Sequence, residues 1–236
     1  MFYSEHYTPP LCDYNKNGNL SLEGILKAFE YVGNHHAEKA NDLMAKDGFA
    51  WILTEWRVEI LRRPVFGEKL IATTWVTVGA VSFISDRLIT LEDTEGNLLV
   101  KASGVFVYVD MKANKMVKIE KELIDAYGPE DKQIFDGKLP RLTIKGEPKA
   151  QDIPIILRRS DSDYNRHIHN TRYLAFITDI LPQSVYDRDD FHSIRILYKK
   201  AVRDTDTAVI RNYENTERFL YGIYKDKELC TVIELK

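Results

Sequence analysis

Side chains able to assist acid–base or carbonyl chemistry gather between residues 159 and 173. Two carboxylates, an amide and an imidazole stand there at alternate positions: Asp161, Asp163, Asn165 and His167. An apolar pattern at helical spacing begins at Tyr173 and ends before Pro182. A helix N-terminus presents free N–H groups and a positive dipole end, which suit a carbonyl oxygen that becomes negative during reaction. A well-capped helix with no catalytic role would use the same residues, so both interpretations stay open.

Alternation along an extended chain would place Asp163, Asn165 and His167 on one side, where they could converge. Histidine has a reference pKa near 6.5, which suits a general base, and asparagine is a neutral hydrogen-bond donor. The alternative for His167 is a capping or core histidine. His169 shares the alternation, so a metal site with Asp161 or Asp163 is conceivable, but no cysteine or further histidine lies at ligand spacing. We therefore predict no metal and no cofactor.

Residues 13–21 look like the first nine positions of an EF-hand calcium loop, with Gly18 where that loop turns sharply. The position that must supply a bidentate glutamate is Gly24, however, and Glu23 lies one residue early. Two prolines just before the segment also prevent an entering helix. We therefore predict a turn here, followed by a helix with Ser21 as its N-cap.

The sequence contains an internal repeat, which predicts two copies of one unit made of a helix and a sheet. Residues 163–166 echo residues 13–16, and each copy precedes an amphipathic helix. Segment 60–65 similarly resembles segment 197–202. Two copies indicate a duplicated domain rather than a solenoid.

The pattern of apolar residues predicts the elements of each copy. The first helix should bury one apolar face: Leu22, Ile25, Leu26, Phe29 and Val32. Strands are expected at residues 50–61, 70–78, 81–92 and 98–110, with a hairpin turn at 93–97. The second copy should have a helix at 171–181 and strands near 193–200, 207–214, 216–225 and 229–235. A helix against an antiparallel sheet, twice, is an α+β pattern.

Composition indicates a globular protein that does not bind nucleic acid through its overall charge. The 236 residues are 44% hydrophobic, and a net charge of −3 gives no overall attraction to nucleic acid. Basic clusters at 62–63, 158–159 and 199–203 suit solvated faces or an acidic partner. We predict a cytoplasmic protein with no membrane span, because no apolar stretch is long enough, the N-terminus lacks a signal-peptide pattern, and two cysteines fit a reducing compartment.

Residues 160–170 closely resemble the signature S-D-x-D-x-N-x-H-x-x-N of plant and bacterial acyl-ACP thioesterases. Segments 48–53 and 63–68 also resemble a strand and a turn in the first half of that family. The resemblance implies two tandem hot-dog domains, each a central helix wrapped by an antiparallel sheet. Residues 1–130 would form the N-terminal hot-dog with the acyl-chain tunnel, residues 131–152 a linker, and residues 153–236 the C-terminal hot-dog with the catalytic motif.

Residue by residue, the resemblance makes Asn165 the group that polarises the thioester carbonyl, His167 the group that positions or activates water, and Asp163 the group that holds them in place. The sequence departs from the family where a glutamate is expected to help activate water, because that position is Ala201. Asp163, or the nearby Asp204 or Asp206, would then be the substitute carboxylate.

The expected function is hydrolysis of fatty acyl-ACP thioesters to free fatty acid and carrier-protein thiol, without a metal or a covalent nucleophile. The partner would be an acyl carrier protein bearing a fatty acyl chain. Two alternatives stay open: an acyl-CoA thioesterase of the hot-dog class, and a non-catalytic acyl-binding protein, which Ala201 suggests. A homodimer also stays open, and the sequence does not give the acyl chain length.

Overall fold

The computed structural model describes residues 1–42, 48–77, 83–137, 139–213 and 218–236. The chain divides into two compact units, Met1–Leu139 and Pro140–Lys236. The division falls within the predicted linker 131–152. Residues on either side of the division contact the unit to which they belong. The carbonyl of Lys132 accepts a hydrogen bond from Trp75 Nε1, and Leu142 is buried against Leu220 and Val232.

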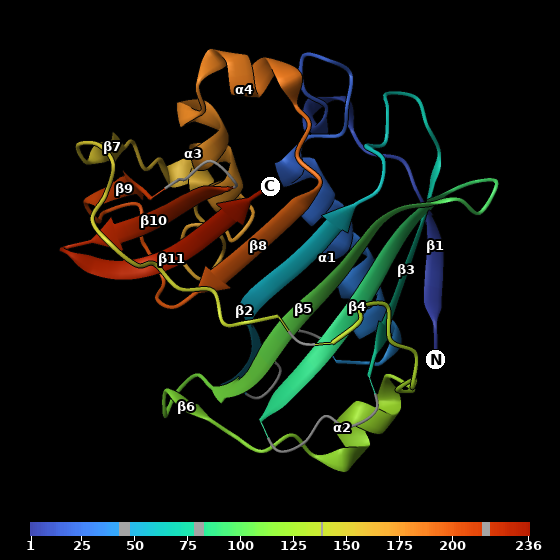
Figure 1. Cartoon of the computed structure of the whole chain (residues 1–236). Coiled ribbons are helices and arrows are strands. Elements are labelled where there is room, and N and C mark those ends of the chain that lie inside the picture. Colours follow the sequence, from blue (N-terminus) through green and yellow to red (C-terminus); the bar gives the residue numbers. More distant parts are fainter. Residues whose placement is uncertain (43–47, 78–82, 138, 214–217) are drawn as a thin grey trace. The chain divides into compact units, whose positions relative to one another are not determined.

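The first unit is an antiparallel sheet with one long helix (Figure 1). Its strands are β1 (Tyr3–Tyr7), β2 (Phe49–Ile60), β3 (Leu70–Val76), β4 (Ile84–Asp93), β5 (Leu98–Asp110) and the short β6 (Lys115–Met116). They lie in the order β1-β3-β4-β5-β2, and β6 pairs with β5. The helices are α1 (Leu22–Lys39) and α2 (Lys121–Ala126).

Helix α1 begins where the sequence predicted. The Ser21 hydroxyl accepts a hydrogen bond from the Gly24 N–H at 2.9 Å, which satisfies one of the free donors of the first turn. All five residues of the predicted apolar face are buried. Because this face covers the sheet, α1 fixes the position of the loop that precedes it.

The second unit repeats this plan (Figure 1). Its strands are β7 (Ile153–Ile155), β8 (Ser193–Tyr198), β9 (Ala208–Asn212), β10 (Phe219–Lys225) and β11 (Glu228–Leu235), in the order β8-β11-β10-β9-β7 and antiparallel. Helix α3 (Arg172–Ile180) buries Tyr173, Leu174, Phe176 and Ile177, and a second helix, α4 (Gln183–Arg188), follows it. The ring of Tyr173 meets that of Tyr198 edge-on at 5.8 Å, which seats α3 against β8.

The α+β prediction is confirmed, and most predicted strands agree with the structure to within two residues. The predicted strand ends at residues 78, 81, 214 and 216 lie outside the described residues. Short elements were missed: β1, β6, β7, α2 and α4. Elements of two to six residues carry too few periods for a hydrophobic pattern to stand out.

Candidate active site

The residues of the motif form a tight loop at the entrance to α3. A 3-10 turn at Arg159–Asp161 leads into an isolated bridge between Ser162 and Ile168. Between the bridge partners, the Asp163 N–H donates to the carbonyl of His167 at 2.7 Å, and the Arg166 N–H donates to the carbonyl of Asp163 at 3.0 Å. The chain therefore reverses within five residues.

Asp163 holds this loop through its side chain. Its Oδ1 accepts the N–H of Asn165 at 2.8 Å and the N–H of His167 at 3.1 Å. Arg166 adopts a φ of 62°, a left-handed conformation that the turn requires. One carboxylate oxygen thus orients the backbone on both sides of the turn.

The expectation of an extended lead-in from 163 to 167 is wrong. The segment is a turn, because one acceptor oxygen that serves two N–H groups requires the chain to bend around it. Alternation along a strand therefore does not bring the three side chains together. The reversal of the chain around the Asp163 carboxylate instead fixes the backbone at Asn165 and His167.

Asp161 is a second, buried anchor. Its carboxylate accepts the N–H of Arg158 at 2.9 Å and the Nε–H of Arg172 at 3.0 Å. Arg172 is the first residue of α3, so this ion pair joins the loop to the helix. A buried carboxylate needs such a partner, because burial without one is costly.

Asn165 lies exposed on the turn, and His167 is half-buried beside it. Among the residues that the structure describes, the imidazole of His167 has no hydrogen-bond partner and no ion pair, so its nitrogens are available to a ligand or to water. His169 is engaged differently, because its Nδ1 lies 3.1 Å from the Thr171 hydroxyl, at the N-cap of α3. No group of three or more His, Cys, Asp or Glu side chains arranged for a metal ion occurs within the described ranges.

The segment after β8 touches the loop directly. The Ile168 N–H donates to the carbonyl of Val202 at 2.7 Å, so the exposed Ala201 lies next to the segment that carries His167. Asp206 is committed elsewhere: its carboxylate accepts the Arg203 N–H at 2.8 Å and pairs with Lys225. Burial would raise the pKa of Asp206, but these two donors outweigh it and lower the pKa.

Neither cysteine belongs to this loop. Cys230 is fully buried in β11, and its burial raises the pKa of the thiol, which disfavours the thiolate. Cys12 belongs to the first unit.

The first unit contains a twin of this loop. After a 3-10 turn at Leu11–Asp13, Asn15 Oδ1 accepts the N–H groups of Asn17 at 3.0 Å and Asn19 at 3.1 Å. Asp13 is buried and pairs with Lys27 at 2.8 Å. The segment is thus the predicted turn, and the carboxylate that would be the first ligand of a calcium loop is bonded to Lys27.

Hydrogen bonds fix the register between the two loops. Ser21 N–H donates to Asp13 O as His169 N–H donates to Asp161 O, each at 2.8 Å. Residues 13–21 therefore correspond to 161–169, two positions away from the echo of 13–16 in 163–166. Asn15, Asn17 and Asn19 occupy the places of Asp163, Asn165 and His167.

Sequence profiles of two domains match the chain over nearly its whole length. The acyl-ACP thioesterase N-terminal domain matches residues 1–127, and the C-terminal domain of the same enzymes matches residues 145–232. The chain belongs to the acyl-ACP thioesterase family. The recognition made from residues 160–170 is thereby confirmed.

Relatives in this family are distant in sequence. The chloroplastic oleoyl-acyl carrier protein thioesterase 1 of Arabidopsis thaliana is 22% identical over 234 residues, which cover 88% of this chain and 62% of that protein. A chloroplastic acyl-[acyl-carrier-protein] hydrolase of Cuphea viscosissima is 23% identical over 197 residues, which cover 78% of this chain and 48% of that protein. The chain thus spans about half to three fifths of the length of these relatives.

Solved structures of the family show the same fold. An acyl-ACP thioesterase from Bacteroides thetaiotaomicron aligns with a TM-score of 0.88 at 19% identity, over 99% of this chain and 96% of that one. The 12:0-ACP thioesterase from Umbellularia californica aligns with a TM-score of 0.85 at 14% identity, over 100% and 96%. The predicted tandem hot-dog fold is confirmed.

Sequence reasoning missed two residues that shape the site. Arg172 neutralises the buried Asp161, and Tyr198 donates its hydroxyl to the carbonyl of Asn170 at 2.9 Å. Arg172 follows the family signature by two residues. Its ion pair with Asp161 could not be predicted from the sequence, because no regular spacing within a helix or strand brings residues 161 and 172 together. In the part of the chain that the structure describes, no helix is long and apolar enough to span a membrane.

Proposed function

We propose that this member of the acyl-ACP thioesterase family hydrolyses fatty acyl thioesters of acyl carrier protein. Water adds to the thioester carbonyl carbon, the carbon–sulfur bond breaks, and a free fatty acid and the carrier thiol are formed. The observation that supports the proposal is the turn built on Asp163, whose carboxylate fixes the backbone N–H groups of both Asn165, which is exposed, and His167, which is half-buried.

Asn165 and His167 have different tasks in this mechanism. The Asn165 amide donates a hydrogen bond to the carbonyl oxygen, which carries negative charge in the tetrahedral intermediate. The His167 imidazole accepts a proton from the attacking water and returns it to the leaving sulfur. Asp163 is a positioning residue, because its Oδ1 is already shared by two backbone N–H groups of the turn.

The carrier and the acyl chain are the finer part of the proposal. We assign catalysis to the unit that contains residues 153–236 and the acyl chain to the unit that contains residues 1–130. Family membership favours a carrier-protein substrate over CoA. The non-catalytic alternative keeps one supporting observation, since Ala201 is exposed beside the loop and offers no carboxylate to a water molecule.

The test is thiol release from acyl-ACP and acyl-CoA of graded chain length. We expect hydrolysis of acyl-ACP, and a loss of about 100- to 1,000-fold in turnover for Asn165→Ala, as for other single oxyanion donors. His167→Ala should lose about 100- to 10,000-fold. The twin loop supplies matched controls, Asn17→Ala and Asn19→Ala, which should retain turnover.

Two results would contradict the proposal. No thiol release from any acyl thioester, with the acyl thioester still bound, would identify an acyl-binding protein. Turnover that survives in folded Asn165→Ala and His167→Ala variants would place the reaction elsewhere.

A further inference from the structure

Five basic side chains surround the candidate reactive loop in the second unit. Arg158 and Arg159 open its 3-10 turn, Arg166 sits at its tip, and Lys199 and Arg203 flank Val202, whose carbonyl bonds to the loop. All five are exposed. Among the described residues, none of the five side chains has a hydrogen bond or an ion pair. We call these five residues the basic rim.

The duplicated fold shows which residues stand at the same places in the first unit. Leu61 N–H donates to Leu99 O as Lys199 N–H donates to Cys230 O, each at 2.8 Å. The N–H of Leu20 bonds to Pro64 O as that of Ile168 bonds to Val202 O. Segment 61–65 therefore corresponds to segment 199–203.

The end of that segment gives the same register. Val65 N–H bonds to the carboxylate of Glu68, and Arg203 N–H bonds to that of Asp206. With both correspondences in place, each member of the basic rim has an uncharged counterpart in the first unit: Pro10, Leu11, Gly18, Leu61 and Val65.

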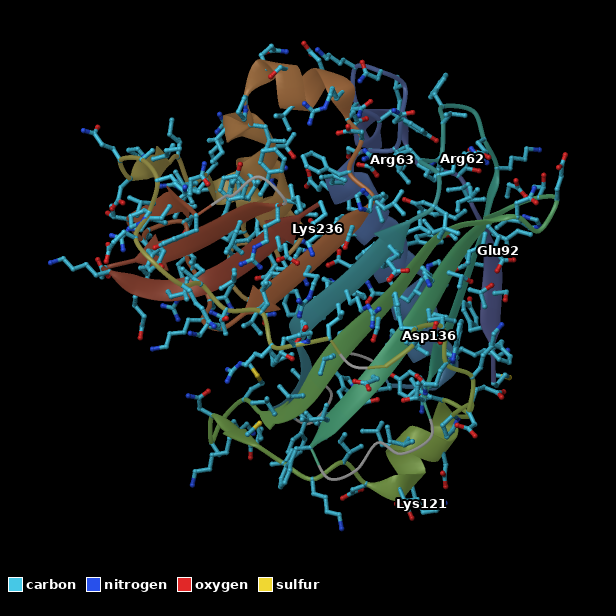
Figure 2. The ribbon with its side chains drawn as sticks, in the orientation of Figure 1. Arg62, Arg63, Glu92, Lys121, Asp136 and Lys236 are labelled. Carbon is cyan, nitrogen blue, oxygen red and sulfur yellow. The ribbon has the colours of Figure 1, made fainter. Side chains whose placement is uncertain are left out.

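The other basic residues at this end of either unit are already paired. Arg62, labelled in Figure 2, pairs with Glu68, and its counterpart Lys200 pairs with Glu228. Arg63, beside it in Figure 2, donates Nε–H to the carbonyl of Leu20 at 2.9 Å. The basic residues that both units share are therefore bonded within the fold. The rim is specific to the second unit, and among the described residues its side chains have no hydrogen bond or ion pair, although the charge of Arg203 helps to lower the pKa of Asp206.

The net charges of the two units differ in sign, and the positive unit is the one that carries the basic rim. Residues 140–236 contain 17 Lys and Arg against 15 Asp and Glu, a net charge of +2, whereas residues 1–139 contain 16 against 21, a net charge of −5. An unpaired cluster of positive charge on a chain with net charge −3 attracts an acidic partner and orients it.

We propose that the basic rim is the docking surface for the acidic face of an acyl carrier protein, and that the carrier docks on the second unit only. This inference rests on the proposed function. Docking there delivers the thioester at the end of its prosthetic arm to Asn165 and His167. The apolar counterpart surface of the first unit, with Leu11, Leu61 and Val65 exposed, does not attract the carrier.

The test compares two substrates that share an acyl chain and arm, acyl-ACP and the protein-free acyl-pantetheine. In Arg159→Glu/Lys199→Glu, kcat/KM for acyl-ACP should fall about tenfold at low salt, and its dependence on ionic strength should weaken. The kcat/KM for acyl-pantetheine should not change. Binding of acyl-ACP, followed by fluorescence anisotropy, should weaken by the same factor.

Two matched controls separate position from total charge. Lys145→Glu/Lys149→Glu makes the same change in net charge on exposed residues of a segment bonded to Asn212, at the other end of β9. This variant should retain wild-type kinetics. Adding Leu11→Arg and Leu61→Lys to the rim variant returns half of the lost positive charge, now on the first unit, and should not restore kcat/KM.

Several outcomes would overturn the docking proposal while the function stands. These are an equal loss for acyl-pantetheine, an equal loss in the Lys145/Lys149 control, or rescue by the substitutions in the first unit. If no thioester is hydrolysed at all, the proposed function fails, and the anisotropy measurement still decides the docking: equal affinity of the wild type and the rim variant for acyl-ACP refutes it.

Discussion

Asp163 allows the charge of the loop to be separated from its geometry. In the twin loop, Asn15 occupies the same place and accepts the same two N–H groups through one oxygen, at 3.0 and 3.1 Å. Asp163→Asn should therefore keep the turn, because its amide oxygen can accept the bonds that the carboxylate now accepts at 2.8 and 3.1 Å. Asp163→Ala removes the acceptor and should not.

The hydrogen bonds set the magnitudes. A bond to a charged group contributes about 1.5–3 kcal/mol and a neutral one about 0.5–1.5 kcal/mol. Two weakened bonds at a half-buried site predict a loss of about 1 kcal/mol in the free energy of unfolding for Asp163→Asn. Two lost bonds predict about 2–3 kcal/mol for Asp163→Ala. Because Asp163 positions and does not react, turnover in Asp163→Asn should stay within about tenfold of wild type.

Urea unfolding and thiol release from acyl-ACP, measured on both variants, check these values. The control Asn15→Asp in the first unit should leave turnover unchanged. The reasoning is refuted if Asp163→Asn destabilises the protein as much as Asp163→Ala. A stable Asp163→Asn variant with abolished turnover and intact acyl binding would show instead that the carboxylate itself takes part in water activation.

Three further predictions follow from the structure. Ala201→Glu should raise turnover at neutral pH by up to about 100-fold. Position 201 is exposed, and the side chain of its counterpart in the first unit, Arg63, reaches the backbone of the twin loop at Leu20. An unchanged rate in a folded variant would mean that another group activates water. Burial, assisted by the positive charge of Arg87, lowers the pKa of His36 to about 4, so the unfolded chain binds a proton between pH 6.5 and 4 that the folded protein does not. The free energy of unfolding should therefore fall by roughly 3 kcal/mol as the pH falls through that window, and thermal unfolding of His36→Gln should lose most of this dependence. Turnover should be insensitive to EDTA, and a rate that EDTA abolishes and a divalent metal restores would contradict water activation by side chains alone.

Much of the fold could be predicted because long elements repeat their pattern several times. Helix α1 and strands β2 and β5 carry enough residues for the apolar period to be unambiguous, and Ser21 marks a helix start by type alone. Strand β7 has three residues and depends on pairing with β9, which no local pattern reveals. Helix α4 starts directly after Pro182, which is its N-cap residue, so a proline that marks the end of α3 in the sequence also precedes a new helix.

The candidate site was selected by residue type, and its geometry could not be predicted. The residues Asp163, Asn165 and His167 were selected because their chemistry suits thioester hydrolysis, and their roles stay predictions. Their arrangement depends on one carboxylate oxygen that bends the chain and on a buried ion pair between Asp161 and Arg172. Neither follows from periodicity, because a turn closed by a side chain has no repeating pattern.

The proposed catalytic loop differs from its counterpart in the first unit at few positions. Both copies keep a buried aspartate paired with a basic residue, a side-chain oxygen shared by two N–H groups, and an asparagine at the turn. The second copy has an imidazole at His167, where the first has Asn19. It also has five basic side chains around the turn that make no hydrogen bond or ion pair with the described residues, at positions whose counterparts in the first unit are uncharged. The scaffold is therefore common to both units, and what distinguishes the proposed reactive copy is one proton acceptor at the turn and the charge around it.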